Sequence, residues 1–217
     1  MSALVTAASD PQAKGFPLAM QVLGERGDAT MVEMTGVVLQ GNPMGMARMG
    51  SLRYLRHLPP TVSLPVAREW WEVADGRGDA ADMILARHAE PEDVPRLRQR
   101  LATCHHAYTQ CNMVDGLARV PGLGPYPELR TVFQEACYSY LRRRSVLAMV
   151  ATDPGYPHVF AEECLWDCES AIREAGVRSA PLLDRVKHRM VELAMDEAED
   201  SDVRDAAVSR LTGPSPA

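Results

Sequence analysis

The stretch Asp200-Ser201-Asp202-Val203-Arg204-Asp205-Ala206-Ala207-Val208-Ser209-Arg210-Leu211 says most about the fold of this 217-residue chain. Its acidic start can accept hydrogen bonds from the free N–H groups that begin a helix. Small side chains follow at helical spacing and would let a second helix approach closely, and Leu211 can fill the groove between the two helices. The segment predicts a short helix over 202–211 that packs against a partner helix.

The rest of the chain repeats this kind of short helical segment. Apolar residues fall on one helical stripe over 158–175, with Gly176 as the expected stop. Sustained alternation of apolar and polar residues, the mark of a strand, is almost absent. Pro, Gly, Asp and Asn separate the segments, so neighbouring helices should run antiparallel and pack on each other. The predicted helices are 16–24, 30–40, 44–57, 64–74, 79–88, 92–102, 105–119, 127–136, 138–151, 158–175, 181–196 and 202–211.

The acidic turn, the Val203-Arg204 pair and the small-residue stripe of the last segment resemble the second helix of a HEAT repeat. Weaker echoes begin near residues 44, 79, 105 and 138 or 158. The resemblance implies an all-α solenoid of about five to six antiparallel helix pairs over 14–211, with a flexible leader at 1–13 and a flexible tail at 212–217. The alternative is a non-repeating helical bundle. The resemblance implies no chemistry by itself, although a concave solenoid face commonly binds another macromolecule.

Charge and composition exclude several classes of function. The net charge is −6, and the 7 basic and 14 acidic residues of 151–217 make the last third the acidic part of the chain. A nucleic-acid surface needs the opposite sign, so we expect no nucleic-acid partner. No apolar run approaches the length of a membrane span, and we expect no membrane contact. Five cysteines and no signal-peptide pattern favour a reduced, cytoplasmic protein, and 21 arginines against two lysines are typical of GC-rich, bacterial-like coding.

Two charges fall on otherwise apolar helical stripes. Asp115 lies within the stripe of 104–119, and Arg144 lies at the centre of the stripe of 137–151. An unpaired buried charge costs several kcal/mol, so the phase predicts a structural ion pair between Asp115 and Arg144. Alternatively, both side chains reach solvent. The Cys104-His105-His106 run splays its side chains around the helix, and Cys164 and Cys168 lie on an apolar stripe, so we predict no metal site and no cofactor.

Aromatic and arginine residues are the candidate binding groups. Trp166 falls on the polar face of its segment, and Trp70 and Trp71 are adjacent. The run Arg142-Arg143-Arg144 leaves Arg142 and Arg143 free to contact a partner if Arg144 faces the core. We therefore predict a non-enzymatic adaptor or scaffold that binds another protein through one solenoid face.

The alternative class is an enzyme or small-molecule binder that uses the concave cleft. Its chemistry would be metal-dependent or directed at a nucleobase, the second prompted by Trp71 and Asp75 one helical turn apart. The sequence contains no phosphate-binding Gly-rich loop and no nucleophile elbow.

Overall fold

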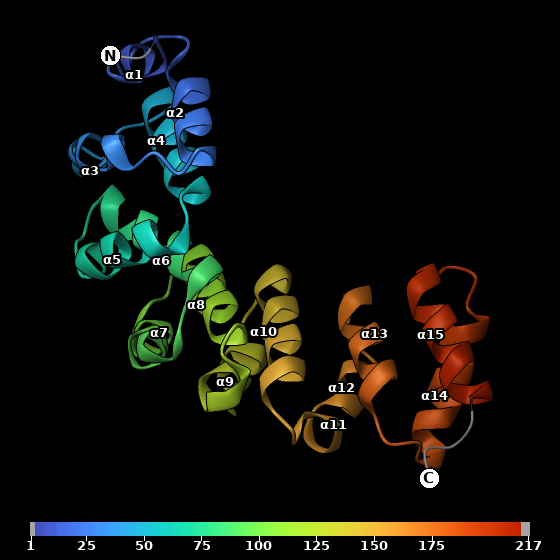
Figure 1. Ribbon diagram of the computed structural model, residues 1–217. Helices are drawn as coiled ribbons and strands as arrows, with labels where there is room; N and C mark the ends of the chain where they lie inside the picture. Colours follow the sequence, from blue (N-terminus) through green and yellow to red (C-terminus); the bar gives the residue numbers. More distant parts are fainter. Residues whose placement is uncertain (1–2, 214–217) are drawn as a thin grey trace. The chain divides into compact units, whose positions relative to one another are not determined.

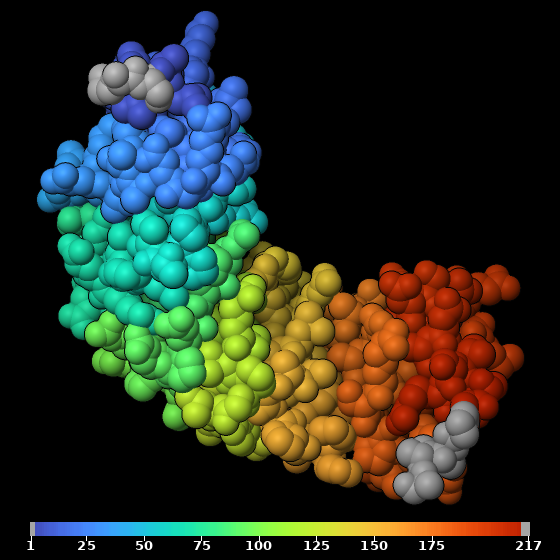
Figure 2. Space-filling view, in the orientation of Figure 1, coloured from blue at the N-terminus to red at the C-terminus, as the bar shows by residue number. Residues whose placement is uncertain are grey.

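The computed structural model describes residues 3–213, and all regular structure in that range is helical, as the sequence predicts. The chain divides into two compact units, with the boundary between Leu97 and Arg98. Side chains fill the spaces between neighbouring helices within each unit (Figure 2). Helix α7 (Val94–Thr103) contains the boundary.

The helices of unit 1 pack mainly on helices one or two places away along the chain (Figure 1). Helix α4 contacts both α2 and α6, while α3 packs on α4 and α6, α5 on α6, and α1 on α2. The expected leader contains α1, whose last residue, Ala8, is buried. The elements are α1 (Ala3–Ala8), α2 (Phe16–Glu25), the 3-10 turn η1 (Ala29–Met31), α3 (Val32–Gln40), α4 (Met46–His57), α5 (Pro60–Trp70), α6 (Gly76–His88) and the 3-10 turn η2 (Pro91–Asp93).

Unit 2 shows two sets of helices. Helices α8, α10, α13 and α15 contact one another in that order, and Figure 1 shows them following side by side. Helix α9 packs on α10, α12 on α13, and α14 on α15. Residues 214–217 of the expected tail lie outside the described residues. The elements are α8 (Ala107–Ala118), the 3-10 turn η3 (Pro121–Leu123), α9 (Pro127–Glu135), α10 (Ser139–Thr152), α11 (Tyr156–Val159), α12 (Ala161–Cys164), α13 (Ser170–Ser179), α14 (Asp184–Met195) and α15 (Ser201–Thr212).

The single helix predicted over 158–175 is wrong. The chain breaks after Cys164, and α13 begins only at Ser170. Asp167 makes the break, because its Oδ1 accepts from the Glu169 backbone N–H at 3.0 Å. Gly176 is not a helix stop but lies inside α13, where a Cβ would be 2.7 Å from the Ala161 carbonyl oxygen. The absence of a side chain at Gly176 therefore allows α12 and α13 to pack closely.

Arginine–carboxylate bridges recur through both units. An arginine on one helix reaches an acid in the turn before a later helix, and the same acid accepts a backbone N–H of its own turn. In α5, Arg68 Nε donates to Asp93 Oδ1 at 2.8 Å, while Asp93 Oδ2 accepts from Glu90 N at 2.9 Å. The other three bridges are Arg130–Asp153, Arg142–Asp167 and Arg173–Glu199.

The four bridges span 25, 23, 25 and 26 residues of sequence. All four acids are buried. A charge-assisted bond to a buried carboxylate is stronger than an exposed ion pair, so these bridges fix the turns against the helices that they contact.

Candidate functional site

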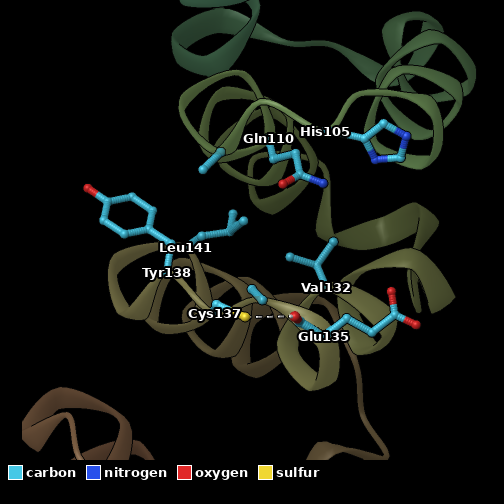
Figure 3. Close-up of a pocket in the computed structure, with 9 residues that line it drawn as sticks. His105, Gln110, Val132, Glu135, Cys137, Tyr138 and Leu141 are labelled. Atoms are coloured by element: carbon cyan, nitrogen blue, oxygen red, sulfur yellow. Dashed lines mark hydrogen bonds between the residues drawn. The ribbon is translucent and has the colours of Figure 1, made fainter.

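The candidate site is a groove in unit 2, where α9 ends and α8 and α10 begin. Its main cavity has a volume of about 330 Å³. Figure 3 shows Gln110 and Val132 facing each other across this cavity, with Tyr138 and Glu135 toward its opposite ends. A second cavity of about 230 Å³ shares His105, Gln110, Val132 and Glu135 with the first, so the two cavities adjoin.

Local sequence explains why aromatic side chains gather at this groove. The residues that precede α8 and α10 are His106 and Tyr138, and both have extended backbones. Neither side chain accepts a hydrogen bond from a backbone N–H of its helix, as the Asp, Ser or Thr residues that usually occupy this position do. Each ring instead contacts Tyr108: the ring centroids of His106 and Tyr138 both lie 5.8 Å from that of Tyr108.

Tyr108, Tyr138 and Tyr140 form the tyrosine cluster beside the groove. The Tyr108 and Tyr138 ring centroids are 5.8 Å apart, and those of Tyr138 and Tyr140 are 5.9 Å apart. Hydrogen bonding to the Tyr108 hydroxyl raises the pKa of Tyr138 above its usual value. Tyr108 is 65% exposed, and all three residues keep part of the ring at the surface. Tyr and Arg in such exposed groups are typical anchors of protein interfaces.

An arginine stacks on one edge of the tyrosine cluster. The Arg144 guanidinium carbon lies 4.4 Å from the Tyr140 ring centroid, and Arg144 also donates to the Tyr140 hydroxyl. Arg144 forms the ion pair with Asp115 that the helical phase predicts, but both side chains remain partly exposed. The pair thus joins α8 to α10 at the rim of the cluster and not in the core.

The predicted binding residues lie in different environments. Trp70 and Trp71 are each only 7% exposed, so neither is presented on a surface as an adaptor face would require. Arg142 is committed to Asp167, with its guanidinium carbon 5.3 Å from the Phe133 ring centroid. These three side chains contribute to packing in their own units.

Arg143 and Trp166 do lie at the surface. Arg143 is exposed on α10, and Trp166 is 55% exposed at the turn after α12. The Arg189 guanidinium carbon lies 5.9 Å from the Trp166 ring centroid. Trp166 is therefore an exposed aromatic residue of unit 2 in addition to the three tyrosines, and no ring contact among the described residues joins it to the tyrosine cluster.

The tyrosine cluster itself was missed by sequence reasoning. Helical phase puts Tyr108 on the same stripe as Cys111, but Tyr108 lies in the first turn of α8, where its side chain projects past the packed part of the helix. Cys168, expected on an apolar stripe, is exposed because the predicted helix breaks before it. The available signal was the placement of Tyr138, Tyr140 and Tyr108 close to two predicted helix starts.

The acidic groups with lowered pKa values have structural partners. Arg173 lowers the pKa of the Glu199 carboxyl, and Arg185 lowers that of Glu162. Between residues 3 and 213, no three His, Cys, Asp or Glu side chains form a group that could hold a metal ion. All five cysteines are free thiols. The described part of the chain also contains no helix with the length and apolar character needed to cross a membrane.

Comparison with known proteins gives no relative: no family model matches this chain, and no curated protein or solved structure shows a significant match. The fold and the site define an all-helical protein with an exposed tyrosine–arginine surface beside a groove.

Proposed function

We propose that this chain is a HEAT-like helical repeat protein that acts as a non-enzymatic adaptor. The tyrosine cluster and its adjoining groove would bind a partner protein. One observation carries the proposal: three partly exposed tyrosines lie together beside a cavity of about 330 Å³. Tyrosine supplies a large apolar contact with a polar tip at a low cost in side-chain entropy, which suits a protein interface.

Two features of packing support a repeat architecture. In unit 2, each helix of the series α8, α10, α13 and α15 contacts the next one, as in a stack of helix pairs. The arginine–carboxylate bridges span 23 to 26 residues, which is shorter than the steps between the starts of α8, α10, α13 and α15 at Ala107, Ser139, Ser170 and Ser201 but equally regular. A non-repeating bundle has no reason to place similar bridges at similar spacing.

The sharpest test introduces a photoreactive phenylalanine analogue at Tyr108 of the full chain in its native host. Met195, which is exposed on α14 of the same unit, is the matched control position. We expect a discrete cross-linked partner from position 108 and none from position 195. We also expect Tyr108→Ala combined with Tyr138→Ala to weaken binding of that partner at least tenfold, or about 1.4 kcal/mol.

Two results would overturn this proposal. One is equal cross-linking from both positions, which would show that contact at Tyr108 is non-specific. The other is unchanged affinity of the double variant for the captured partner. Circular dichroism of the double variant provides the folding control, since neither ring is buried.

A further inference from the structure

Unit 1 exposes three methionines within one short stretch, where the chain turns from α3 into α4. Met44 is 86% exposed, Met46 50% and Met49 41%, and we call these three residues the methionine cluster. Methionine is among the residue types most often buried, because its side chain is apolar. The other large apolar side chains exposed among the described residues of unit 1 are Leu18 on α2 and Val37 on α3. The cluster is therefore a local concentration of thioether groups at the surface.

The backbone keeps the three methionines close together at the start of α4. Gly45 has a φ of 69°, and its carbonyl oxygen accepts from the Met49 backbone N–H at 3.0 Å, so α4 begins directly after it. Met46 and Met49 are three residues apart on the helix, where side chains are neighbours with Cβ atoms about 5–6 Å apart. Met44 lies two residues before Met46, so their Cα atoms are at most about 7 Å apart. All three side chains thus start within reach of one small ligand.

Hydrogen bonds hold this turn against the rest of unit 1. Asn42 has a left-handed φ of 47°, and its side-chain oxygen accepts from Arg48 Nη1 at 3.4 Å. Arg48 Nη2 also donates to Asp79 Oδ2 on α6 at 2.7 Å. Arg48 therefore connects the turn to α6, and its own charge is paired with a carboxylate.

Thioether sulfur is the chemistry that residues 44–49 offer to a ligand. Gly45 has no side chain, Ala47 is buried, and Arg48 is directed to its carboxylate. A thioether is a soft ligand that selects Cu(I), whereas Mg²⁺ and Ca²⁺ prefer oxygen ligands. The unbranched methionine side chain has three rotatable bonds, so the sulfur atoms can adjust to the position of one ion.

We propose that the methionine cluster binds one soft monovalent metal ion of the Cu(I) class through its three sulfur atoms. The expectation of no metal site rested on cysteine and histidine, and thioether ligands lie outside it. An apolar docking surface would be a different use of the same residues. Replacing methionine by leucine separates the two, because leucine keeps an apolar side chain and removes the sulfur. The site lies in unit 1 and does not depend on the tyrosine cluster of unit 2.

The test follows isotope-labelled methionine methyl groups of the full chain by NMR while Ag(I), a soft monovalent probe, is added. The exposed thiols are first alkylated, because thiolates also bind soft ions. We expect one equivalent of Ag(I) to shift the three methyl resonances of the methionine cluster. The resonance of Met195, which is 77% exposed on α14, should stay in place. One equivalent of Mg²⁺ should shift none of them.

Leucine variants then measure what each sulfur contributes to Cu(I) affinity, by competition with the chelator bicinchoninate under anaerobic conditions with ascorbate. Met46→Leu should weaken Cu(I) binding at least about tenfold, because it removes one of three ligands. Met195→Leu, the matched control, should change the affinity less than about twofold, because it removes an exposed sulfur that has no neighbouring methionine.

Three results would overturn the proposal. The first is a Met195 resonance that shifts with Ag(I) as strongly as those of the cluster, which would show that any exposed thioether binds. The second is wild-type Cu(I) affinity in Met46→Leu, which would leave the cluster as an apolar surface only. The third is the absence of any shift at one equivalent of Ag(I). Circular dichroism of each variant provides the folding control.

Discussion

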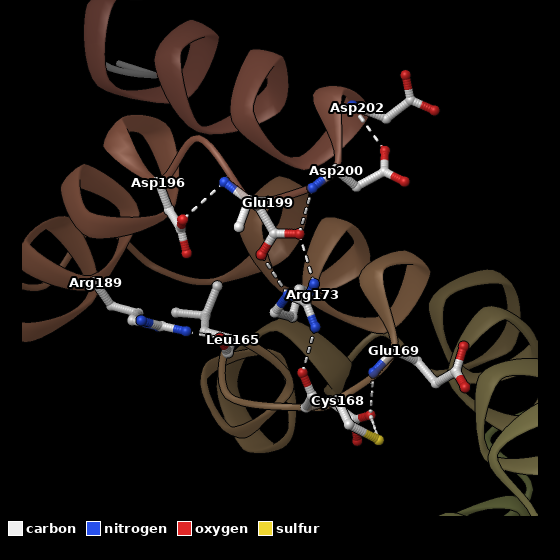
Figure 4. Close-up of polar contacts among 11 residues, drawn as sticks. Leu165, Cys168, Glu169, Arg173, Arg189, Asp196, Glu199, Asp200 and Asp202 are labelled. Carbon is white, nitrogen blue, oxygen red and sulfur yellow. Dashed lines mark hydrogen bonds and ion pairs between the residues drawn. The ribbon is translucent and has the colours of Figure 1, made fainter.

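Arg173 offers the clearest prediction about what holds unit 2 together. Its guanidinium donates to both Glu199 carboxylate oxygens, at 2.6 and 2.5 Å, and to the Asp167 carbonyl oxygen at 2.7 Å (Figure 4). The Glu199 side chain is only 4% exposed, and it also accepts from the Asp200 backbone N–H at 2.7 Å. Replacing Arg173 by alanine therefore leaves a buried carboxylate with one backbone donor.

The expected cost of Arg173→Ala is about 3 kcal/mol. Removing one partner of a fully buried ion pair costs about 3–5 kcal/mol, and the partial exposure of Arg173 lets water replace some of the lost donors. A stability of 5–15 kcal/mol is typical of a domain, so the loss is large. The assay is urea unfolding followed by circular dichroism, analysed for the transition that includes unit 2.

The matched control is Arg178→Ala on the same helix. Arg178 pairs with Glu174 four residues earlier, but its side chain is 63% exposed, so we expect a change within about 0.5 kcal/mol. Equal effects of the two substitutions, or a cost below about 1 kcal/mol for Arg173→Ala, would refute the reasoning. Arg173→Lys should fall between wild type and alanine, because an ammonium cannot donate in the same planar fork.

The same pair predicts a pH dependence with a definite sign. Arg173 lowers the pKa of Glu199 below its ordinary value of 4.5, so the pair stabilises the folded state fully above that value. The stabilisation is lost as pH falls through the lowered pKa. The difference in unfolding free energy between wild type and Arg173→Ala should therefore shrink below pH 4.5, and a constant difference down to pH 3 would contradict this.

Two further predictions concern packing and thiol chemistry. Gly176→Ala should lower the free energy of unfolding in urea by about 1–3 kcal/mol, because the new Cβ would lie 2.7 Å from the Ala161 carbonyl oxygen, and this outweighs the gain of about 1 kcal/mol in helix propensity. The control Gly122→Ala, which has open space around it, should change the free energy of unfolding by less than about 0.5 kcal/mol. A Gly176→Ala variant more stable than wild type would refute the close contact. Burial raises the pKa of the Cys164 thiol to about 11, so Cys164 should be inert to a thiol reagent at pH 8 while the exposed Cys168 reacts. If the Cys164→Ser variant had one fast-reacting thiol fewer than wild type, this prediction would be contradicted.

The spacing of apolar residues predicted most helices, because the buried face of a helix is recorded in the residues of that helix alone. The helices of 105–119, 138–151 and 202–211 all appear, with ends shifted by a few residues. It failed over 158–175, where the apolar stripe is compatible with one continuous helix. The break is stabilised by a distant residue, Arg142 on α10, which pairs with the Asp167 carboxylate, and by Arg173 six residues later, which donates to the Asp167 carbonyl. The eighteen residues of 158–175 do not include Arg142, so the pattern of this segment alone does not show that Arg142 reaches Asp167.

Predicting the candidate site was harder for a related reason. Helical phase tells which face of a helix is apolar, but it does not tell where the neighbouring helix ends. Tyr108 lies on the apolar phase of α8 yet reaches solvent in the first turn, and Trp70 lies buried against Gly36. The pairing of Asp115 with Arg144 was predictable because a charge on an apolar stripe must find an opposite charge nearby.

The arginine–carboxylate bridges also give the excess of arginine over lysine a structural role. An excess of arginine over lysine is typical of GC-rich coding, yet Arg68, Arg130, Arg142 and Arg173 each contact a buried acid in a turn 23 to 26 residues later. These contacts need a guanidinium, which can donate to two carboxylate oxygens and a carbonyl at once, as Arg173 does. The acids belong to turns of different sequence. The recurrence therefore lies in the contacts themselves and not in a repeated run of residues.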